Sequence, residues 1–425
     1  METGGCANQN MEMKRTMNQR TVRKILNDTD FIHTSGTPEE LKVAEYLKAQ
    51  CEALGVKAWL EGFPVAMAEM EEAHLTVDGK EIPCEGYRLC GSGEVEAPLV
   101  YLPDTDPASL TRAAGKIVML DGGVRYFVYH DLLDNGAVGI ITYDGSVFYR
   151  DRDIDKKELR PHVRDGAKKL LCANINAKDA AAIVKRGAKT ARISVKQREY
   201  DGESHNVVAE LAGLTDEWIV LTAHYDTVPL SRGSYDNMSG CVGLLCILDA
   251  LKGKQHRYGL RFVFCGSEER GLLGSKAYVR DHEQELGKIA LNINLDMIGT
   301  YMGHFIARVS AEDALVSYIR YLGAELGFGI APRQGVYSSD STPFADKGVP
   351  ALSFARIAGP SQAVIHNRYD TPDVLSDERL ITDSAFLTEF TRRMANAAKC
   401  PVKREIPEKV KNELDEYLFR KRKAD

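Results

Sequence analysis

The sequence predicts an α/β fold with a doubly wound, mostly parallel but mixed sheet and a smaller β-rich domain inserted into it. Two observations support this prediction. From Asn206 onward, short apolar strands alternate with helical stretches, which is typical of parallel sheets. Between about residues 96 and 196 the strands become short and closely spaced, and a chain of 425 residues is long enough to form two cores.

These changes in pattern predict the domain boundaries. We expect a flexible tail over residues 1–20, a main domain built from 21–95 and 197–400, an insert over 96–196, and a charged helix over 401–425. The last segment ends in four successive basic residues, which are typical of a solvated tail.

The first strong helix signal begins at Thr37. Thr37 is a favourable N-cap, Pro38 suits the first helical position, and Glu40 occupies the capping-box position. An apolar stripe follows, and Gly55 ends it. The pattern indicates a structural scaffold without a catalytic role.

The insert is predicted to have its own strands and helices. Strands are expected at 98–102, 116–120, 138–143 and 191–195, and helices at 130–135 and 177–185. Its Gly-Lys-Ile-Val and Gly-Ala-Val-Gly-Ile-Ile segments resemble the protease-associated domain, an insert found in several peptidases. Two roles stay open, a packing spacer and a domain that helps to capture substrate.

Composition and charge exclude some classes of protein. A net charge of −6 and a pI near 6.0 give no reason to expect binding to nucleic acid or to an anionic membrane. No apolar run approaches the length of a membrane span, and the polar N-terminus lacks the apolar region of a secretory signal. Nine cysteines without paired spacing suit reduced thiols, so we expect a cytoplasmic location.

Candidate metal ligands follow the predicted strands of the main domain. The strands are expected at 206–211, 218–222, 260–265, 289–295 and 351–354. His224 and Asp226 follow the second of them, and a loop rich in small residues then presents Asp236 with Asn237. Imidazole and carboxylate groups are typical zinc ligands, and the carboxyl ends of strands form the ligand crevice of such sheets.

Three further clusters share this location. Adjacent carboxylates, Glu268 and Glu269, follow the third strand, and Asp296 follows the fourth. His366 lies in a loop beyond the fifth strand. Because all of these ligand-type side chains fall at strand ends, we expect them to form one site.

The order of these motifs resembles the co-catalytic di-zinc aminopeptidase family, which includes bacterial leucyl aminopeptidases and glutamate carboxypeptidase. The motifs are HxD, DNxSG, EE before GxxGS, NxDMIG and HxxxDT. The resemblance covers Thr34 to Gly55 and most of Asn206 to Asp377. It implies a metal-dependent exopeptidase that acts on peptides, with two zinc ions per chain for which cobalt or manganese could substitute.

The resemblance also implies which residues hold the metals. His224 would bind one zinc ion and His366 the other, and Asp236 would bridge the two ions. Glu269 and Asp296 would complete the two separate shells. A pair of zinc ions about 3.5–4 Å apart lowers the pKa of a shared water and stabilises the tetrahedral oxyanion.

Three other residues receive roles in the same way. Glu268 would be the general base, and Asp226 would orient the imidazole of His224. Tyr337 is our candidate for a hydroxyl that helps to hold the oxyanion. The chain departs from the family pattern at Ser341, where a larger His or Tyr is usual, and after His366, where Asn367-Arg368 replaces the usual threonine. These departures bear on specificity.

Several alternatives remain open at this point. The aminoacylase and carboxypeptidase relatives place a large domain between the last carboxylate and the last histidine, whereas here the insert precedes His224. A single-zinc enzyme like glutaminyl cyclase would share the ligand set, and a non-catalytic binding module would usually lose ligands. A carboxypeptidase would need arginines for a free carboxylate, and Arg333, Arg356 and Arg368 lie in the appropriate loops. The simpler relatives favour an aminopeptidase, and the oligomeric state stays open.

Overall fold

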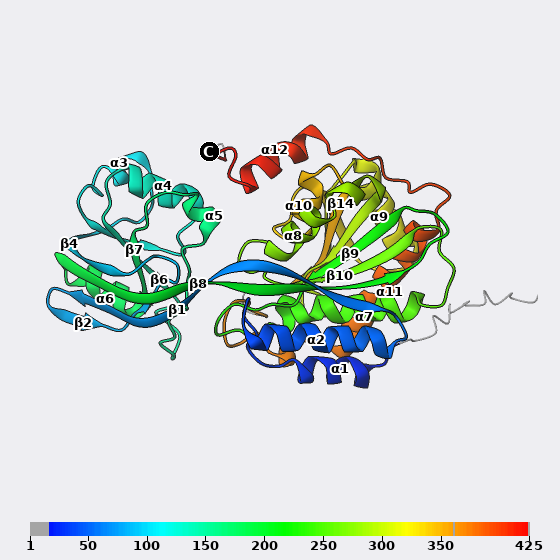
Figure 1. Cartoon of the computed structure of the whole chain (residues 1–425), viewed down its shortest axis with the longest axis horizontal. Coiled ribbons are helices and arrows are strands. Elements are labelled where there is room, and N and C mark those ends of the chain that lie inside the picture. Colours follow the sequence, from blue (N-terminus) through cyan, green and yellow to red (C-terminus); the bar gives the residue numbers. More distant parts are fainter. Residues whose placement is uncertain (1–16, 360–361, 424–425) are drawn as a thin grey trace, which may run out of the picture. The chain divides into compact units, whose positions relative to one another are not determined.

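The computed structural model describes residues 17–359 and 362–423, which form two compact units (Figure 1). Of the described residues, 17–61 and 205–414 belong to the first unit, and 62–204 and 415–423 belong to the second. None of the helices in the described ranges is both long enough and apolar enough to cross a membrane.

The first unit contains a mixed sheet with a parallel centre, which confirms the predicted fold class. Its four central strands run parallel, in the order β14 (Ala351–Ile357), β11 (Ile289–Leu295), β9 (Trp218–His224) and β10 (Gly259–Cys265). Antiparallel strands flank them, β12 (His304–Ser310) beside β14 and β8 (Thr190–Leu211) beside β10, and β13 (Ile330–Gln334) follows β12. The carboxyl ends of the four central strands therefore share one edge.

Helices cover both faces of this sheet, because successive side chains of the central strands point to opposite faces. One face packs against α1 (Gln19–Asp28), α2 (Pro38–Ala53), α7 (Ser239–Leu251), α9 (Asp313–Glu325) and α11 (Asp377–Asn396). The other packs against α8 (Leu273–Asp281), α10 (Ser341–Asp346) and α12 (Glu408–Tyr417). Shorter helical turns are η1 (Ser234–Met238), η2 (Glu283–Lys288) and η3 (Pro372–Val374).

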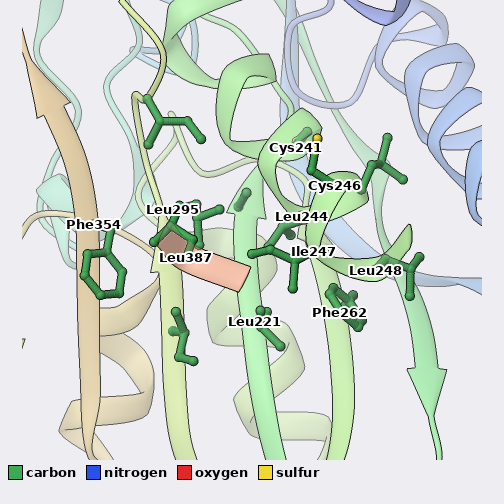
Figure 2. Close-up of a cluster of buried hydrophobic side chains, with 14 of the residues drawn as sticks. Leu221, Cys241, Leu244, Cys246, Ile247, Leu248, Phe262, Leu295, Phe354 and Leu387 are labelled. Carbon is green, nitrogen blue, oxygen red and sulfur yellow. The ribbon is translucent and has the colours of Figure 1, made fainter. Parts of the chain in front are cut away.

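Helix α7 lies at the centre of the larger core (Figure 2). Leu244, Ile247 and Leu248 of α7 are fully buried, and they belong to the same cluster as Leu221 and Phe262 from the sheet. Burying each side chain of this size contributes about 1.5–3 kcal/mol. Because α7 is anchored along its length, the loop that leads into its N-terminus has a well-defined position.

The start of the chain differs in part from the prediction. Helix α2 forms as expected, with the Thr37 side chain accepting a hydrogen bond from the Glu40 amide at 3.3 Å. The predicted tail covers residues 1–20, of which 1–16 lie outside the described residues. Gln19 already begins α1, whose N-cap is Asn18. The prediction missed α1.

The second unit contains a parallel sheet of β4 (Gly93–Tyr101), β5 (Ile117–Asp121), β6 (Gly139–Asp144) and β7 (Leu171–Asn176), in that order. The short strand β3 (Glu85–Gly86) pairs with β7, and β2 (Lys80–Ile82) pairs with β1 (Ala58–Val77). Its helices are α3 (Pro107–Leu110), α4 (Tyr126–Asp134), α5 (Pro161–Arg164) and α6 (Ala177–Lys185). A core separate from those of the first unit holds these elements together.

The boundaries of this unit differ from the predicted insert over 96–196, because the unit contains residues 62–204 together with 415–423. The long strand β1 contributes most of its length to the unit, and β8 joins the two strands predicted at 191–195 and 206–211 into one. Exposed residues interrupt the apolar pattern of β8, which concealed its continuity. The C-terminal helix is also shorter than the predicted 401–425, since α12 spans only Glu408–Tyr417.

Candidate metal centre

The predicted ligand clusters meet at the carboxyl edge of the central strands. His224 is the last residue of β9, Asp296 follows β11, and Glu268 and Glu269 lie just beyond β10. Asp236 comes from η1, immediately before the anchored helix α7. The loop after β14 adds His366, so the structure brings together all of the predicted ligands.

Asp236 lies between the two histidines. Its Oδ1 is 3.1 Å from His224 Nε2, and its Oδ2 is 3.1 Å from His366 Nε2. Glu269 Oε1 is 3.1 Å from His366 Nε2, and Asp296 Oδ1 is 3.8 Å from His224 Nε2. The site thus contains two sets of donors that share the carboxylate of Asp236.

The donors fit two divalent cations. In each set, His224–Asp236–Asp296 and Asp236–Glu269–His366, the ligand atoms lie within 4.8 Å of one another. Asp296 Oδ1 is buried without a hydrogen-bond partner, which is costly for a carboxylate unless a cation neutralises it. Imidazole nitrogens with carboxylate oxygens, and no thiolates, suit zinc and leave room for cobalt or manganese.

The protein alone gives these groups strongly perturbed pKa values. Burial disfavours the charged form of Asp236, but hydrogen bonds with His224 and His366 hold its pKa below the usual range. Burial also disfavours the His366 imidazolium, but the carboxylates of Glu269 and Asp236 raise its pKa to about 11. Burial raises the pKa of Glu268 well above its usual value, and nearby His224 opposes this rise. Such clustering of opposed charges is typical of functional sites.

Asp226 has contacts in the site beyond the predicted one with His224. Its carboxylate oxygens accept hydrogen bonds from the amides of Glu268 at 2.8 Å and Glu269 at 3.2 Å. The nearer contact of His224 Nδ1 is the backbone oxygen of Asp226 at 3.3 Å, and the carboxylate lies 3.6 Å away. The side chain therefore holds the loop that carries the two glutamates, and both its carboxylate and the backbone oxygen of Asp226 lie beside the imidazole of His224.

Two residues that received no role from the sequence pattern support the site. Asp370 accepts hydrogen bonds from the amides of Tyr235 at 2.7 Å and Asp236 at 3.1 Å. Asn237 accepts hydrogen bonds from the amides of Gly240 and Met297, both at 3.0 Å. The sequence signal for these roles was the position of Asp370 in the HxxxDT motif and of Asn237 in the DNxSG motif. Together they connect the loops of Asp236, His366 and Asp296.

The remaining predicted residues lie around this centre. Tyr337 is partly buried, and burial together with the charges of Asp296 and Asp236 raises the pKa of its phenol far above the usual value. Ser341 is buried, and its hydroxyl hydrogen-bonds with those of Ser339 at 3.0 Å and Ser353 at 2.8 Å. Ser341 thus belongs to a serine cluster beneath the loop that carries Tyr337.

The three arginines that could bind a substrate carboxylate differ in burial and in their partners. Arg356 is buried, and it forms a two-point ion pair with Asp383, through Nε at 2.8 Å and Nη2 at 2.5 Å. Arg333 is exposed on the edge strand β13, and Arg368 is exposed in the loop after His366. Arg356 is therefore already committed to a structural partner.

Residues 206–390 match peptidase family M28. This family region contains every predicted ligand of the site, and the predicted resemblance is confirmed. The region also includes α7 and most of α11, which pack against the central strands.

Curated aminopeptidases are similar to part of this chain. Aminopeptidase YwaD of Bacillus subtilis is 35% identical over 173 residues, which cover 38% of this chain and 38% of that protein. A probable leucine aminopeptidase 2 of Trichophyton verrucosum is 30% identical over 304 residues, covering 66% of this chain and 59% of the fungal protein. The matches thus span 38% and 59% of the lengths of these two relatives.

Solved structures share the fold over nearly the whole chain. An aminopeptidase from Aneurinibacillus sp. strain AM-1 superposes with a TM-score of 0.74 and 24% identity, covering 92% of this chain and 97% of that structure. BSAP, a zinc aminopeptidase from Bacillus subtilis, gives the same score and identity over 94% and 98% of the two chains. The mixed α/β architecture is therefore that of M28 aminopeptidase structures.

Proposed function

We propose that this protein is a zinc-dependent aminopeptidase whose site holds two metal ions. The observation that carries the proposal is the position of Asp236, whose two carboxylate oxygens each face a different histidine at 3.1 Å. A carboxylate shared in this way is the arrangement expected of a two-metal hydrolase. In this proposal His224 and Asp296 hold one ion, Glu269 and His366 hold the other, and Asp236 bridges them.

Bound metal ions would supply a water of lowered pKa and positive charge that stabilises the oxyanion. The chain's own residues would manage the protons and the substrate. Glu268, with Oε2 4.0 Å from His224 Nε2, also groups with His224 and Glu269, but neither of the two donor sets that share Asp236 includes it. We assign it the role of general base, which takes the proton of the attacking water and returns it to the leaving amine. Tyr337 is the candidate to donate a hydrogen bond to the oxyanion.

Charge supports aminopeptidase activity over carboxypeptidase activity. Carboxylates outnumber imidazoles at this edge of the sheet, and buried Asp226 and Asp370 add to the ligand carboxylates. Together with Glu268, these carboxylates carry more negative charge than two divalent cations would neutralise, so the site would favour a protonated α-amine over a free carboxylate. Arg356, the buried candidate for binding a carboxylate, is paired with Asp383 instead.

Two further proposals accompany this function. Every cysteine among the described residues is a free thiol, and most are buried, which supports a location in the reducing cytoplasm. The second proposal is that residues 96–196 form a domain like the protease-associated domain. It is supported by the parallel sheet that β4, β5, β6 and β7 form in the second unit.

The test uses metal-free protein titrated with zinc against amino-acid p-nitroanilides and N-blocked dipeptides. We expect turnover of the unblocked p-nitroanilides that rises to two zinc equivalents. Cleavage of N-blocked dipeptides alone would contradict the proposed direction. Saturation at one equivalent would contradict the two-metal site.

The role of Glu268 has its own test. We expect Glu268→Gln to lower kcat by about 10²–10⁴-fold, the usual contribution of general acid–base catalysis. Zinc stoichiometry, measured by calorimetry, should not change, because Glu268 is not one of the assigned ligands. A variant with full activity would remove Glu268 from the mechanism.

A further inference from the structure

The segment from His33 to Glu40 contacts both loops that supply the centre of the site. The amide of Thr227, next to Asp226, donates to the His33 carbonyl at 3.2 Å, and the His33 amide donates to Thr227 Oγ1 at 3.1 Å. Thr34 and Thr227 form a parallel bridge. The segment that leads into α2 therefore fixes the loop after β9, although the sequence pattern indicated only a scaffold.

Glu40 holds the loop after β10, as His33 and Thr34 hold the loop after β9. It is only 1% exposed, and its Oε1 accepts hydrogen bonds from the amide of Ser267 at 3.1 Å and from the Ser267 hydroxyl at 3.4 Å. Its other oxygen accepts from the amide of Gly36 at 2.6 Å. The hydroxyls of Ser35 and Ser267 are also hydrogen-bonded to each other. Glu40 thus connects the beginning of α2 to the residue that precedes Glu268.

The contacts of Glu40 differ from those of an ordinary capping box. In that motif the glutamate returns to the backbone amide of its own N-cap residue. Here the amide of the N-cap residue Thr37 donates to the carbonyl of Thr34, and Glu40 is directed toward Gly36 and Ser267. A buried carboxylate is tolerated only with such strong partners. Its position in the first turn of α2 adds a favourable interaction with the helix dipole.

The loop after β10 needs these partners to keep its shape. Ser267 has a φ of 55°, in the left-handed region that costs energy for a residue other than glycine. Three successive amides are held by two carboxylates, that of Ser267 by Glu40 and those of Glu268 and Glu269 by Asp226. The directions of the Glu268 and Glu269 side chains follow from this backbone conformation.

From these contacts we propose that Glu40 is a positioning residue, which holds the backbone of Ser267 so that Glu268 and Glu269 face the metal site. Its kinetic consequences rest on the proposed function. Its effect on metal affinity does not, because Glu269 lies in a donor set that the geometry defines by itself. The experiment therefore measures both the kinetic constants and the zinc affinity.

The variants are Glu40→Ala, which removes both acceptors, and Glu40→Gln, which keeps one acceptor oxygen in a side chain of similar shape. Glu39→Ala is the matched control, because Glu39 is the neighbouring acidic residue in the same helical turn and is exposed. All are made in the full chain. The readouts are kcat and KM on an amino-acid p-nitroanilide well below the melting temperature, and calorimetric zinc affinity.

We expect Glu40→Ala to lower kcat by about 10- to 100-fold with KM nearly unchanged, as small displacements of catalytic groups do. It should weaken the binding of one zinc ion by about 10- to 100-fold, as loss of a supporting partner does. Glu40→Gln should recover only part of both losses, because its amide nitrogen cannot accept from the second backbone amide, and Glu39→Ala should match the wild type.

The proposal is overturned if folded Glu40→Ala keeps wild-type kcat and zinc affinity, or if its losses disappear once the folded fraction is taken into account. If Glu40→Ala does not fold, Glu40→Gln decides. A measurable loss of kcat or zinc affinity at unchanged folded fraction then supports positioning, and wild-type values overturn it. If the wild type hydrolyses no peptide substrate, the proposed function fails, and the zinc affinities alone decide the role of Glu40.

Discussion

Individual buried charges show how the protein separates structural residues from candidate catalytic ones. Arg356 is buried with Asp383 and donates two hydrogen bonds to it. Asp296, in contrast, has a buried oxygen without a hydrogen-bond partner, beside a histidine. A satisfied pair indicates a structural role, and an unsatisfied carboxylate in a cluster of ligands indicates a place for a cation.

Removing the arginine of the satisfied pair should destabilise the fold. We expect Arg356→Ala to lower the free energy of unfolding by about 3–5 kcal/mol, because Asp383 is left buried and uncompensated. Urea denaturation measures the change. The exposed pair of Arg280 and Asp281 provides the control, and Arg280→Ala should cost at most about 1 kcal/mol.

The same variant also tests the direction of the exopeptidase. If Arg356 is structural, the preference for unblocked p-nitroanilides should stay unchanged in Arg356→Ala at temperatures where the protein is folded. Acquired or lost cleavage of N-blocked dipeptides, without a loss of stability, would instead place Arg356 in the substrate site.

At the scale of elements, the site depends on how closely α7 approaches β11. A Cβ atom added to Gly240 would lie 2.5 Å from the backbone oxygen of Leu295 and 2.4 Å from Asn237 Oδ1. Neither atom can move freely, because Leu295 ends β11 and Asn237 is hydrogen-bonded on both sides. Only glycine allows the N-terminus of α7 to approach the strand that precedes Asp296 this closely.

We expect Gly240→Ala to lower the free energy of unfolding by about 1–3 kcal/mol, the usual cost of overpacking a core. It should also weaken zinc binding, because Asp236 and Asp296 are carried by the two elements that are pushed apart. Thermal unfolding and calorimetry measure the two effects. Gly287→Ala is the control, since a Cβ there has no atom within 4 Å. Normal zinc affinity in Gly240→Ala would show that the site tolerates the displacement.

At the scale of the molecule, metal binding and folding should be coupled. The ligands come from β9, η1 and the loops after β10, β11 and β14, so the donors converge only in the folded chain. A ligand that binds only the native state at 100 times its Kd adds about 2.7 kcal/mol of stability.

We therefore expect chelation with EDTA to lower the melting temperature and zinc to restore it. A doubly substituted variant, His224→Ala with His366→Ala, provides the control and should show no shift with zinc. A melting temperature of the native chain that does not depend on metal would contradict a metal centre in this position.

Much of the fold and of the ligand set could be predicted locally. The apolar runs of β9, β10 and β11 each end beside a ligand-type side chain, so periodicity and residue type located the site edge. The exposed residues in β8 and the extent of β1 broke these patterns, and the boundaries of the second unit were therefore misplaced. Helix α1 was missed because its short sequence followed a polar N-terminus.

The sequence by itself determined which residue types could bind metal, the strands that carry them, and the family to which their order points. Only the tertiary structure decided what Glu40, Arg356 and Asp370 do. Their partners are Ser267, Asp383 and Tyr235, which lie 227, 27 and 135 positions away in the chain. Local periodicity carries no information about such partners. A buried charge obtains its role from the groups that satisfy it, and folding brings those groups together.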